Sequence, residues 1–415
     1  MVKDKYLEKV TFWVTGIFVF LLPLDVKILV PLIGLMILMA IFRAKRSGIT
    51  NNIQTFKSSF IFFILLFLWQ LITIAWSTDT SNGLKAIEHR LFYLAAPLLF
   101  LLVKKWPSFQ MMRIFVISNF LICLYCFAHL AHFFITEKFY FIDRTINEGI
   151  TLETFHYIAY HGGANFVVFD VHRLYFSFSL LSAFLFLYFN KDILKNRVFR
   201  YIVAFTFIFV IFLLVSKIAI MLLVALLCYI TYQKLRKSKA KKRMIIMSVF
   251  ILIMSLGFYL AKTRFRQSIE QMGAINEKKE GSLIERFQYT KCSLELIGEA
   301  PVFGYGIGDI NTKMKEKLIK NDFTFLLHKG VYDPHNEFLK TYIGSGVIGF
   351  FLFFGIFISI FRRAYYNQNI LLMIYTGIVF IVCMIEPFLS RQAGILPVLF
   401  FIGLLTYNEK NTLLA

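Results

Sequence analysis

The feature that most constrains this chain is a series of apolar segments, most of them long enough to cross a lipid bilayer. An α-helix of roughly 20 apolar residues spans a bilayer core and satisfies its own backbone hydrogen bonds. Hydrophobic residues make up 58% of the 415 residues, far more than a soluble domain needs. The sequence therefore predicts an all-α, polytopic membrane protein with about 12 transmembrane helices. We expect these helices near residues 10–24, 27–42, 59–76, 84–103, 109–135, 173–189, 198–215, 218–232, 244–261, 335–361, 370–386 and 393–407.

The distribution of the basic residues predicts the orientation of these helices. The formal net charge of +21 could suggest a nucleic-acid partner, but Lys and Arg occur in short loops between alternate apolar segments. This is the positive-inside pattern of membrane proteins. A topology with one span fewer would put the dense basic run at 234–243 outside, so we reject it. We therefore expect both termini in the cytoplasm, membrane lipids around the chain, and no nucleic acid.

Two segments on the predicted outer side are too long to be simple turns, at about 136–172 and 262–334. The second has helical signals of its own. Ser282 and Glu285 form a capping box, which predicts a helix that ends near Pro301. The second segment is therefore expected to be a mostly helical outer domain.

Closely spaced glycines, Gly304, Gly306 and Gly308, predict a tight turn in this outer domain, followed by a helix with Asp309 as its N-cap. The glycine spacing is not a dinucleotide fingerprint, because no strand–helix unit surrounds it. The expected domain organisation is listed by residue range: transmembrane helices with a short outer segment at 1–261, the outer helical domain at 262–334, and the last transmembrane helices with a cytoplasmic tail at 335–415.

The end of the outer domain carries the strongest candidate for a catalytic residue, His335. Asp333 is a favourable N-cap and Pro334 fits the first helical position, so we expect His335 in the first turn of the next helix. There the positive end of the helix dipole disfavours imidazolium, and a neutral imidazole can act as a general base. The same helical stripe would carry Leu339, Tyr342, Gly346 and Gly349. The glycines would let a neighbouring helix approach; the alternative is a buried histidine with ordinary packing glycines.

Several cationic residues lie on the same predicted outer side as His335, four near span ends and Arg286 in the capped helix of the outer domain. They are Arg90, Arg173, Lys217, Arg286 and Arg391. Charges at membrane depth are costly and therefore mark candidate functional sites. A cationic cluster beside a neutral histidine suits an anionic substrate, with phosphate the obvious group. The alternative explanation is snorkelling or ion pairing, such as Glu88 with Arg90 and Glu386 with Arg391.

A metal site is the competing chemistry, and the sequence does not favour it. Histidines cluster in and after the fifth apolar segment, at His129, His132, His156, His161 and His172. No carboxylate or Cys joins them at a ligand-like spacing. We therefore expect neither a metal nor another cofactor.

Several of these motifs resemble those of one known family. His335-Asn336, followed after nine residues by Gly346-x-x-Gly349, resembles the histidine motif of the bacterial O-antigen ligase and O-antigen polymerase superfamily. Arg286 and the segment at 300–308 look like the arginine and proline–glycine segment that precede that motif. Ser216-Lys217 is similar to the Ser-Arg/Lys pair of the family, and Arg90 and Arg173 lie where its members often carry arginines. The number of spans and the large loop before the tenth span fit as well.

This resemblance implies a specific reaction. It implies transfer of a glycan from undecaprenyl diphosphate to a lipid A–core hydroxyl, on the periplasmic side of the bacterial inner membrane, without metal or cofactor. His335 would be the general base, and Arg286 the catalytic cation beside it. The residues expected to bind the diphosphate are Lys217, Arg173, Arg90 and Asn336.

The sequence leaves open two related reactions that differ from the ligase reaction in their acceptor. A polysaccharide polymerase uses another glycan as acceptor, and a protein O-oligosaccharyltransferase uses a protein. The chain length and the single compact outer domain favour the ligase. A lipid-linked glycan flippase or transporter is a different class and predicts charges at the span centres and inverted repeats. Here the charges lie at the outer edge, which favours the transferase.

Overall fold

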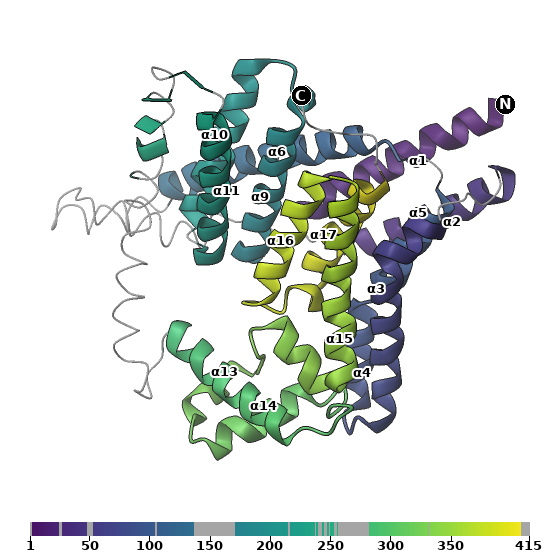
Figure 1. Ribbon diagram of the computed structural model, residues 1–415, viewed down its shortest axis with the longest axis vertical. Helices are drawn as coiled ribbons and strands as arrows, with labels where there is room; N and C mark the ends of the chain where they lie inside the picture. Colours follow the sequence, from purple (N-terminus) through teal and green to yellow (C-terminus); the bar gives the residue numbers. More distant parts are fainter. Residues whose placement is uncertain are drawn as a thin grey trace. The chain divides into compact units, whose positions relative to one another are not determined.

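The computed structural model describes residues 2–24, 27–47, 53–103, 106–136, 171–214, 216–236, 282–330 and 332–407, with a few residues between 238 and 255 (Figure 1). The regular elements in these ranges are helices. Five of the helices are long and apolar enough to cross a membrane, and five shorter apolar helices accompany them in the described residues. The prediction of an all-α, polytopic membrane protein is confirmed. The expected span at 244–261 lies largely outside the described residues.

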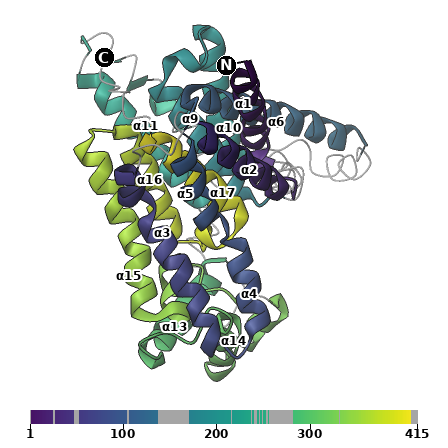
Figure 2. The same cartoon turned by 90° about the vertical axis from the view of Figure 1, so that its right-hand side faces the viewer.

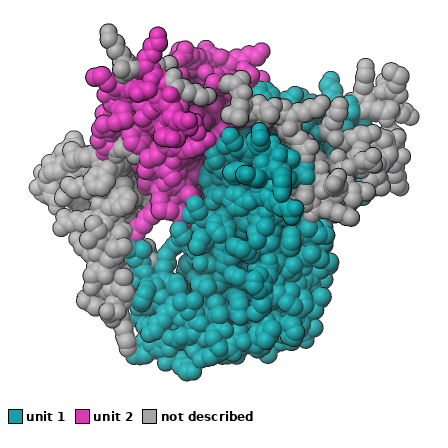
Figure 3. Space-filling model, in the orientation of Figure 1, with its two compact units in different colours: residues 1–111, 270–415 teal, residues 112–269 magenta. Residues whose placement is uncertain are grey.

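The chain packs as two compact units, residues 1–111 with 270–415, and residues 112–269 (Figure 3). The first unit contains α1 (Val2–Leu21), α2 (Leu29–Ser47), α3 (Ile53–Thr73), α4 (Thr80–His89), α5 (Phe92–Leu102), α13 (Ser282–Glu299), α14 (Ile310–Lys320), α15 (Glu337–Tyr366), α16 (Ile370–Cys383) and α17 (Gln392–Tyr407). The second contains most of α6 (Ser108–Thr136), with α9 (Arg173–Phe189), α10 (Arg197–Leu214) and α11 (Lys217–Arg236). These units follow packing, whereas the predicted domains follow membrane sides, so the latter division stays a prediction.

The second unit is organised around α9. Almost all of this helix is buried, including its serines, so it is apolar on every side and packs against α10 and α11. One of its buried serines links it to α6: the Ser179 hydroxyl donates to Asn119 Oδ1 at 2.8 Å. Arg173 begins α9 and Lys217 begins α11.

The first unit carries the predicted outer domain. Figures 1 and 2 both show α13 and α14 grouped at the end where α15 begins, beside α4. The predicted capping-box helix is present: α13 begins at Ser282 and ends at Glu299. The helix after Asp309 is also present as α14, but the Asp309 side chain does not cap it. Instead its carboxylate accepts three hydrogen bonds, each at 2.8 Å. The donors are the backbone N–H groups of Thr78 and Asp79 and the hydroxyl of Thr78.

The expected span at 84–103 is wrong as a single helix. The chain forms α4 over Thr80–His89, turns at Arg90 and Leu91, and continues as α5 over Phe92–Leu102. The reason is the polar stretch Glu88-His89-Arg90: it ends an amphipathic helix, and the strongly apolar α5 begins only after it. Asp79 caps α4 by accepting a hydrogen bond from Asn82 N at 2.9 Å.

A break in α15 replaces the predicted glycine stripe. Gly346 has φ 63° and ψ −162°, so the helical register that would have joined His335 to Gly349 ends there. Backbone N–H groups of Tyr305 and Gly306 bond to the carbonyls of Ile343 and Gly344 at 2.9 and 3.0 Å. These bonds satisfy carbonyls that a broken helix would otherwise leave unpaired.

The neighbour that approaches Gly346 is therefore the glycine-rich loop at 302–308 and not a helix. A Cβ atom on Gly346 would lie only 2.1 Å from Val302 O, and one on Gly304 only 2.5 Å from Gly346 N. Both glycines also have positive φ, so they meet a steric and a conformational requirement together. The prediction of a tight turn at these glycines is confirmed, with the helix break as its partner.

Candidate functional site

The site is centred on His335, which lies just before α15 and not in its first turn. Asn336 is the N-cap, because its side-chain oxygen accepts hydrogen bonds from Phe338 N at 2.8 Å and Leu339 N at 3.1 Å. The predicted cap at Asp333 is therefore wrong by three positions. His335 itself has φ 51°, a left-handed conformation that is uncommon for residues other than glycine.

Asp333 has a different role, which is to hold the backbone of His335. Its Oδ1 accepts a hydrogen bond from His335 N at 3.3 Å, and its Oδ2 accepts one from Lys340 Nζ at 2.6 Å. Burial raises the pKa of this carboxyl, but the charge and hydrogen bond of Lys340 lower it by more, so the net shift is downward. Asp333 thus ties the left-handed residue to the first turn of α15.

Glu386 lies between Arg286 and His335. Its Oε2 is 3.0 Å from Arg286 Nη2 and 3.5 Å from His335 Nδ1, so one oxygen faces both groups. Burial raises the pKa of Glu386, but the neighbouring His335 and Arg286 lower it by more. The carboxylate therefore stays ionised. The ion pair considered from sequence, Glu386 with Arg391, is replaced by Glu386 with Arg286.

The imidazole of His335 is buried on one side and open on the other. Its Nδ1 is buried and makes no hydrogen bond within the described residues, whereas the side chain as a whole is 32% exposed. The ring lies edge-to-face against Tyr289, with centroids 5.3 Å apart. Burial raises the pKa of Tyr289 to about 12, so this phenol stays neutral. The exposed part of the imidazole is thus available to a ligand.

The loop between α16 and α17 is the third element of the site, and further hydrogen bonds fix it. The Asn336 amide donates to Met384 O at 2.8 Å, and Arg286 Nη1 donates to Ile385 O at 2.9 Å. Arg286 comes from α13, so three separate segments of the chain meet at His335. This loop positions Glu386 opposite the histidine.

Arg90 belongs to a second cluster on the same loop. Its Nη2 donates to Ser390 Oγ at 2.6 Å, and Ser390 Oγ donates to Glu337 Oε1 at 2.6 Å. Arg90 Nη2 is also 3.7 Å from that oxygen, and Nη1 donates to Ala86 O at 2.9 Å. The ion pair considered from sequence, Glu88 with Arg90, is therefore replaced by Glu337. Only 4% of the Arg90 side chain is exposed.

The structure brings together four of the predicted site residues: Arg90, Arg286, His335 and Asn336 lie in the first unit, around the loop at 384–390. Arg173 and Lys217 belong to the second unit, and their place in the same site stays a prediction.

The sequence pattern did not predict the roles of Glu337, Lys340 and Ser390, and it favoured Arg391 over Arg286 as the partner of Glu386. Each follows or opens an apolar span, so the polar residues at span ends were the available signal.

The part of the chain described here contains no set of ligands for a metal ion. No group of three or more His, Cys, Asp or Glu residues there could hold one. His156 and His161, considered from sequence, lie outside the described residues.

Comparison with known families identifies this region. Residues 202–354 match the family described as O-antigen ligase. These residues belong to the O-antigen ligase superfamily. The matched stretch contains Lys217, Arg286 and the whole segment from His335 to Gly346, whereas Arg90 and Glu386 lie outside it. No curated protein matches the chain.

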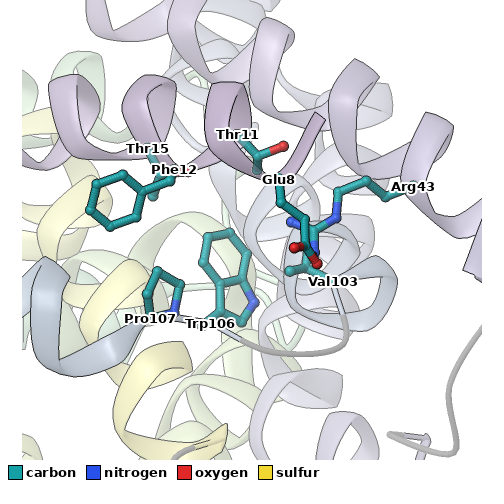
Figure 4. Close-up of a pocket in the computed structure, with 8 residues that line it drawn as sticks. All are labelled: Glu8, Thr11, Phe12, Thr15, Arg43, Val103, Trp106 and Pro107. Atoms are coloured by element: carbon teal, nitrogen blue, oxygen red, sulfur yellow. The ribbon is translucent and has the colours of Figure 1, made fainter. Parts of the chain in front are cut away.

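A separate pocket of about 290 Å³ lies at the other end of the first unit (Figure 4). Its walls come from α1, the end of α2 and the segment after α5, and an ion pair between Glu8 and Arg43 closes one side at 3.4 Å. Phe12 of α1 and Trp106 of the segment after α5 are apolar members of its lining. Neither His335 nor Arg286 lines it, so it is distinct from the candidate site.

Proposed function

We propose that the protein is an O-antigen ligase-type glycosyltransferase. It moves a glycan from undecaprenyl diphosphate to a lipid A–core hydroxyl on the periplasmic side of the bacterial inner membrane, with both termini in the cytoplasm. The superfamily match supports a ligase- or polymerase-type glycosyltransferase. The observation that carries the proposal is the half-open imidazole of His335 beside the exposed guanidinium of Arg286, with Glu386 between them.

In this reaction His335 acts as the general base. The acceptor oxygen attacks the anomeric carbon, its proton moves to the imidazole, and the bond from that carbon to the diphosphate oxygen breaks. The electron pair of that bond leaves with the lipid diphosphate. General-base catalysis by a positioned histidine contributes about 10²- to 10⁴-fold in rate.

Arg286 stabilises the charge that develops on the departing diphosphate. Its side chain is 38% exposed, so the guanidinium can reach a ligand. Removal of one such charge-stabilising donor commonly costs on the order of 3–4 kcal/mol of transition-state stabilisation. Lys217 and Arg173 are the further cations of the proposal, and Asn336 orients the loop beside the base. No metal takes part in these steps.

Other acceptors give the second candidate functions, a polysaccharide polymerase or a protein O-oligosaccharyltransferase. The chemistry at His335 would be the same in each. The compact outer segment at 282–334 favours the ligase. A flippase or transporter is less well supported, because the cations gather at span ends and a histidine stands among them.

A transfer assay with purified protein tests the proposal. The protein in lipid nanodiscs receives a glycan on undecaprenyl diphosphate and one of three acceptors: lipid A–core, a second carrier-linked glycan, or an acceptor protein. Mass spectrometry should find the glycan on lipid A–core, and a chelator should leave the rate unchanged. Product on only one of the other acceptors would reassign the reaction. No product on any, or inhibition by chelator reversed by a divalent ion, would contradict the proposal.

A further inference from the structure

One carboxylate oxygen in the site faces two groups that the proposed reaction uses separately. Glu386 Oε2 is 3.0 Å from Arg286 Nη2, within hydrogen-bond distance, and 3.5 Å from His335 Nδ1. The longer contact is not a hydrogen bond, and Nδ1 is left buried without one in the described residues. A buried polar atom without a partner is costly and calls for an explanation. Arg286 thus donates a hydrogen bond to the same carboxylate oxygen that His335 Nδ1 faces.

We infer that Glu386 is a positioning residue that makes the activity of His335 depend on the lipid diphosphate: the diphosphate draws Arg286 away, and the released carboxylate then accepts a hydrogen bond from His335 Nδ1–H. This inference rests on the proposed function. It assigns a role to a residue that lies outside the segment matched to the O-antigen ligase family.

The exchange at Arg286 follows from charge and exposure. A diphosphate carries more negative charge than a single carboxylate and suits the planar fork of a guanidinium. Arg286 is 38% exposed, whereas Glu386 is only 10% exposed, so the arginine can turn to a ligand while the carboxylate stays in place. The Arg286 fork is held on the protein side by two contacts, Ile385 O and Glu386 Oε2.

The released Glu386 carboxylate changes the basicity of His335, because the two imidazole nitrogens have different roles. A hydrogen bond from Nδ1–H to a carboxylate fixes the tautomer in which Nε2 has the lone pair. When Nε2 takes the acceptor proton, the adjacent carboxylate stabilises the imidazolium that forms. Before donor binding, Arg286 neutralises that carboxylate, so the base is weaker.

A charge-removing variant separates this role from a structural one. Glu386→Gln frees Arg286 from its carboxylate, so undecaprenyl diphosphate should bind several-fold tighter, as measured by isothermal titration calorimetry in detergent. The same variant should lower kcat about 10²-fold, because His335 loses the group that orients it. A purely structural role would weaken binding and turnover together.

Two controls sharpen the experiment. Glu316→Gln removes a negative charge from an exposed residue of α14 that pairs with Lys313, and it should change neither quantity. In an Arg286→Ala background, Glu386→Gln should no longer tighten binding, because the arginine to be released is gone. If Glu386→Gln does not fold, Glu386→Asp retains the charge at a shorter reach and should lower kcat with no gain in affinity.

The outcomes are distinct. Tighter binding with lower kcat supports the inference. Unchanged or weaker binding by Glu386→Gln, or an unchanged kcat, overturns it while leaving the proposed function in place. If the wild-type protein neither binds undecaprenyl diphosphate nor transfers a glycan from it, the proposed function itself fails.

Discussion

Two arginine–carboxylate clusters meet on the same loop between α16 and α17, and they differ in exposure. Arg286 pairs with Glu386 at 3.0 Å with 38% of its side chain exposed. Arg90 lies 3.7 Å from Glu337 with 4% exposed, and Ser390 bridges the two. From the sequence, both arginines are predicted to serve the diphosphate.

The exposed fraction of each guanidinium indicates which role that arginine can have. A half-open guanidinium with one carboxylate partner can exchange that partner for a ligand at little cost. A guanidinium enclosed by protein acceptors cannot leave without stranding a buried carboxylate that has no other cation, which costs several kcal/mol. Arg286 therefore suits a substrate ligand, and Arg90 suits a structural clamp that holds the loop and the first turn of α15. Four variants test this difference between the two arginines and the loop and helix that hold them.

The largest effect is expected for Arg90→Ala. This change leaves Glu337 buried beside Ser390 without its cation, and loss of one partner of a buried pair costs about 3–5 kcal/mol. The free energy of unfolding in detergent should fall by this amount. Unchanged stability together with loss of donor binding would instead support the prediction that Arg90 binds the diphosphate.

Arg286→Ala should have the next largest effect, and it should be kinetic. Transfer should slow by about 10²- to 10³-fold, because a cation at the departing diphosphate is lost. The unfolding free energy should fall by less than for Arg90→Ala, since the Arg286 side of the ion pair is 38% exposed although Glu386 is buried. Arg362→Ala is the matched control, because Arg362 stacks on Tyr366 at the far end of α15. Equal effects of the two changes would count against the role of Arg286.

Gly346→Ala tests the break in α15, the helix whose first turn carries Glu337. A Cβ atom there would lie 2.1 Å from Val302 O, on backbone with φ 63°. Such a conformation costs on the order of 1–3 kcal/mol for a residue with a side chain, so the unfolding temperature should fall. Gly34→Ala in α2 is the control, because nothing lies within 4 Å of the new atom. A fall of the same size in both would show that packing at Gly346 is unimportant.

Asp333→Asn should have the smallest effect, and that effect should depend on pH. The pKa of Asp333 is lowered below its ordinary value of 3.8, so the carboxylate stabilises the fold above that value and loses this contribution as the pH falls through the lowered pKa. At neutral pH the variant should be about 1–2 kcal/mol less stable. The difference in unfolding temperature between the two proteins should shrink in acid. A constant difference at all pH values would contradict this account.

Periodicity and charge were enough to predict the all-α membrane fold and the outer helices α13 and α14, because lipid allows few arrangements of a backbone. They did not predict the break of the expected span at 84–103 into α4 and α5. The same local signals failed at Asp333 and Asp309. Both occupy positions where an N-cap is favourable, yet tertiary partners take their carboxylates, Lys340 for one and the turn at Thr78 for the other. The pairing of Arg286 with Glu386 spans 100 residues, and no local pattern reports a contact of that separation. The histidine motif predicted His335 as a site residue. The groups that contact His335, such as Glu386 and Tyr289, are known only from the structure.

The central claim is that His335 is the base that transfers a lipid-linked glycan, and a replacement in cells tests it most directly. In cells where His335→Ala replaces the native protein, lipopolysaccharide and lipid-linked glycan would be run on gels side by side. The account predicts that full-length polymer accumulates on the carrier lipid while the core stays bare. A core with one repeat unit and no ladder would instead indicate a polymerase. Unchanged pools, with the variant present in the membrane, would contradict the claim.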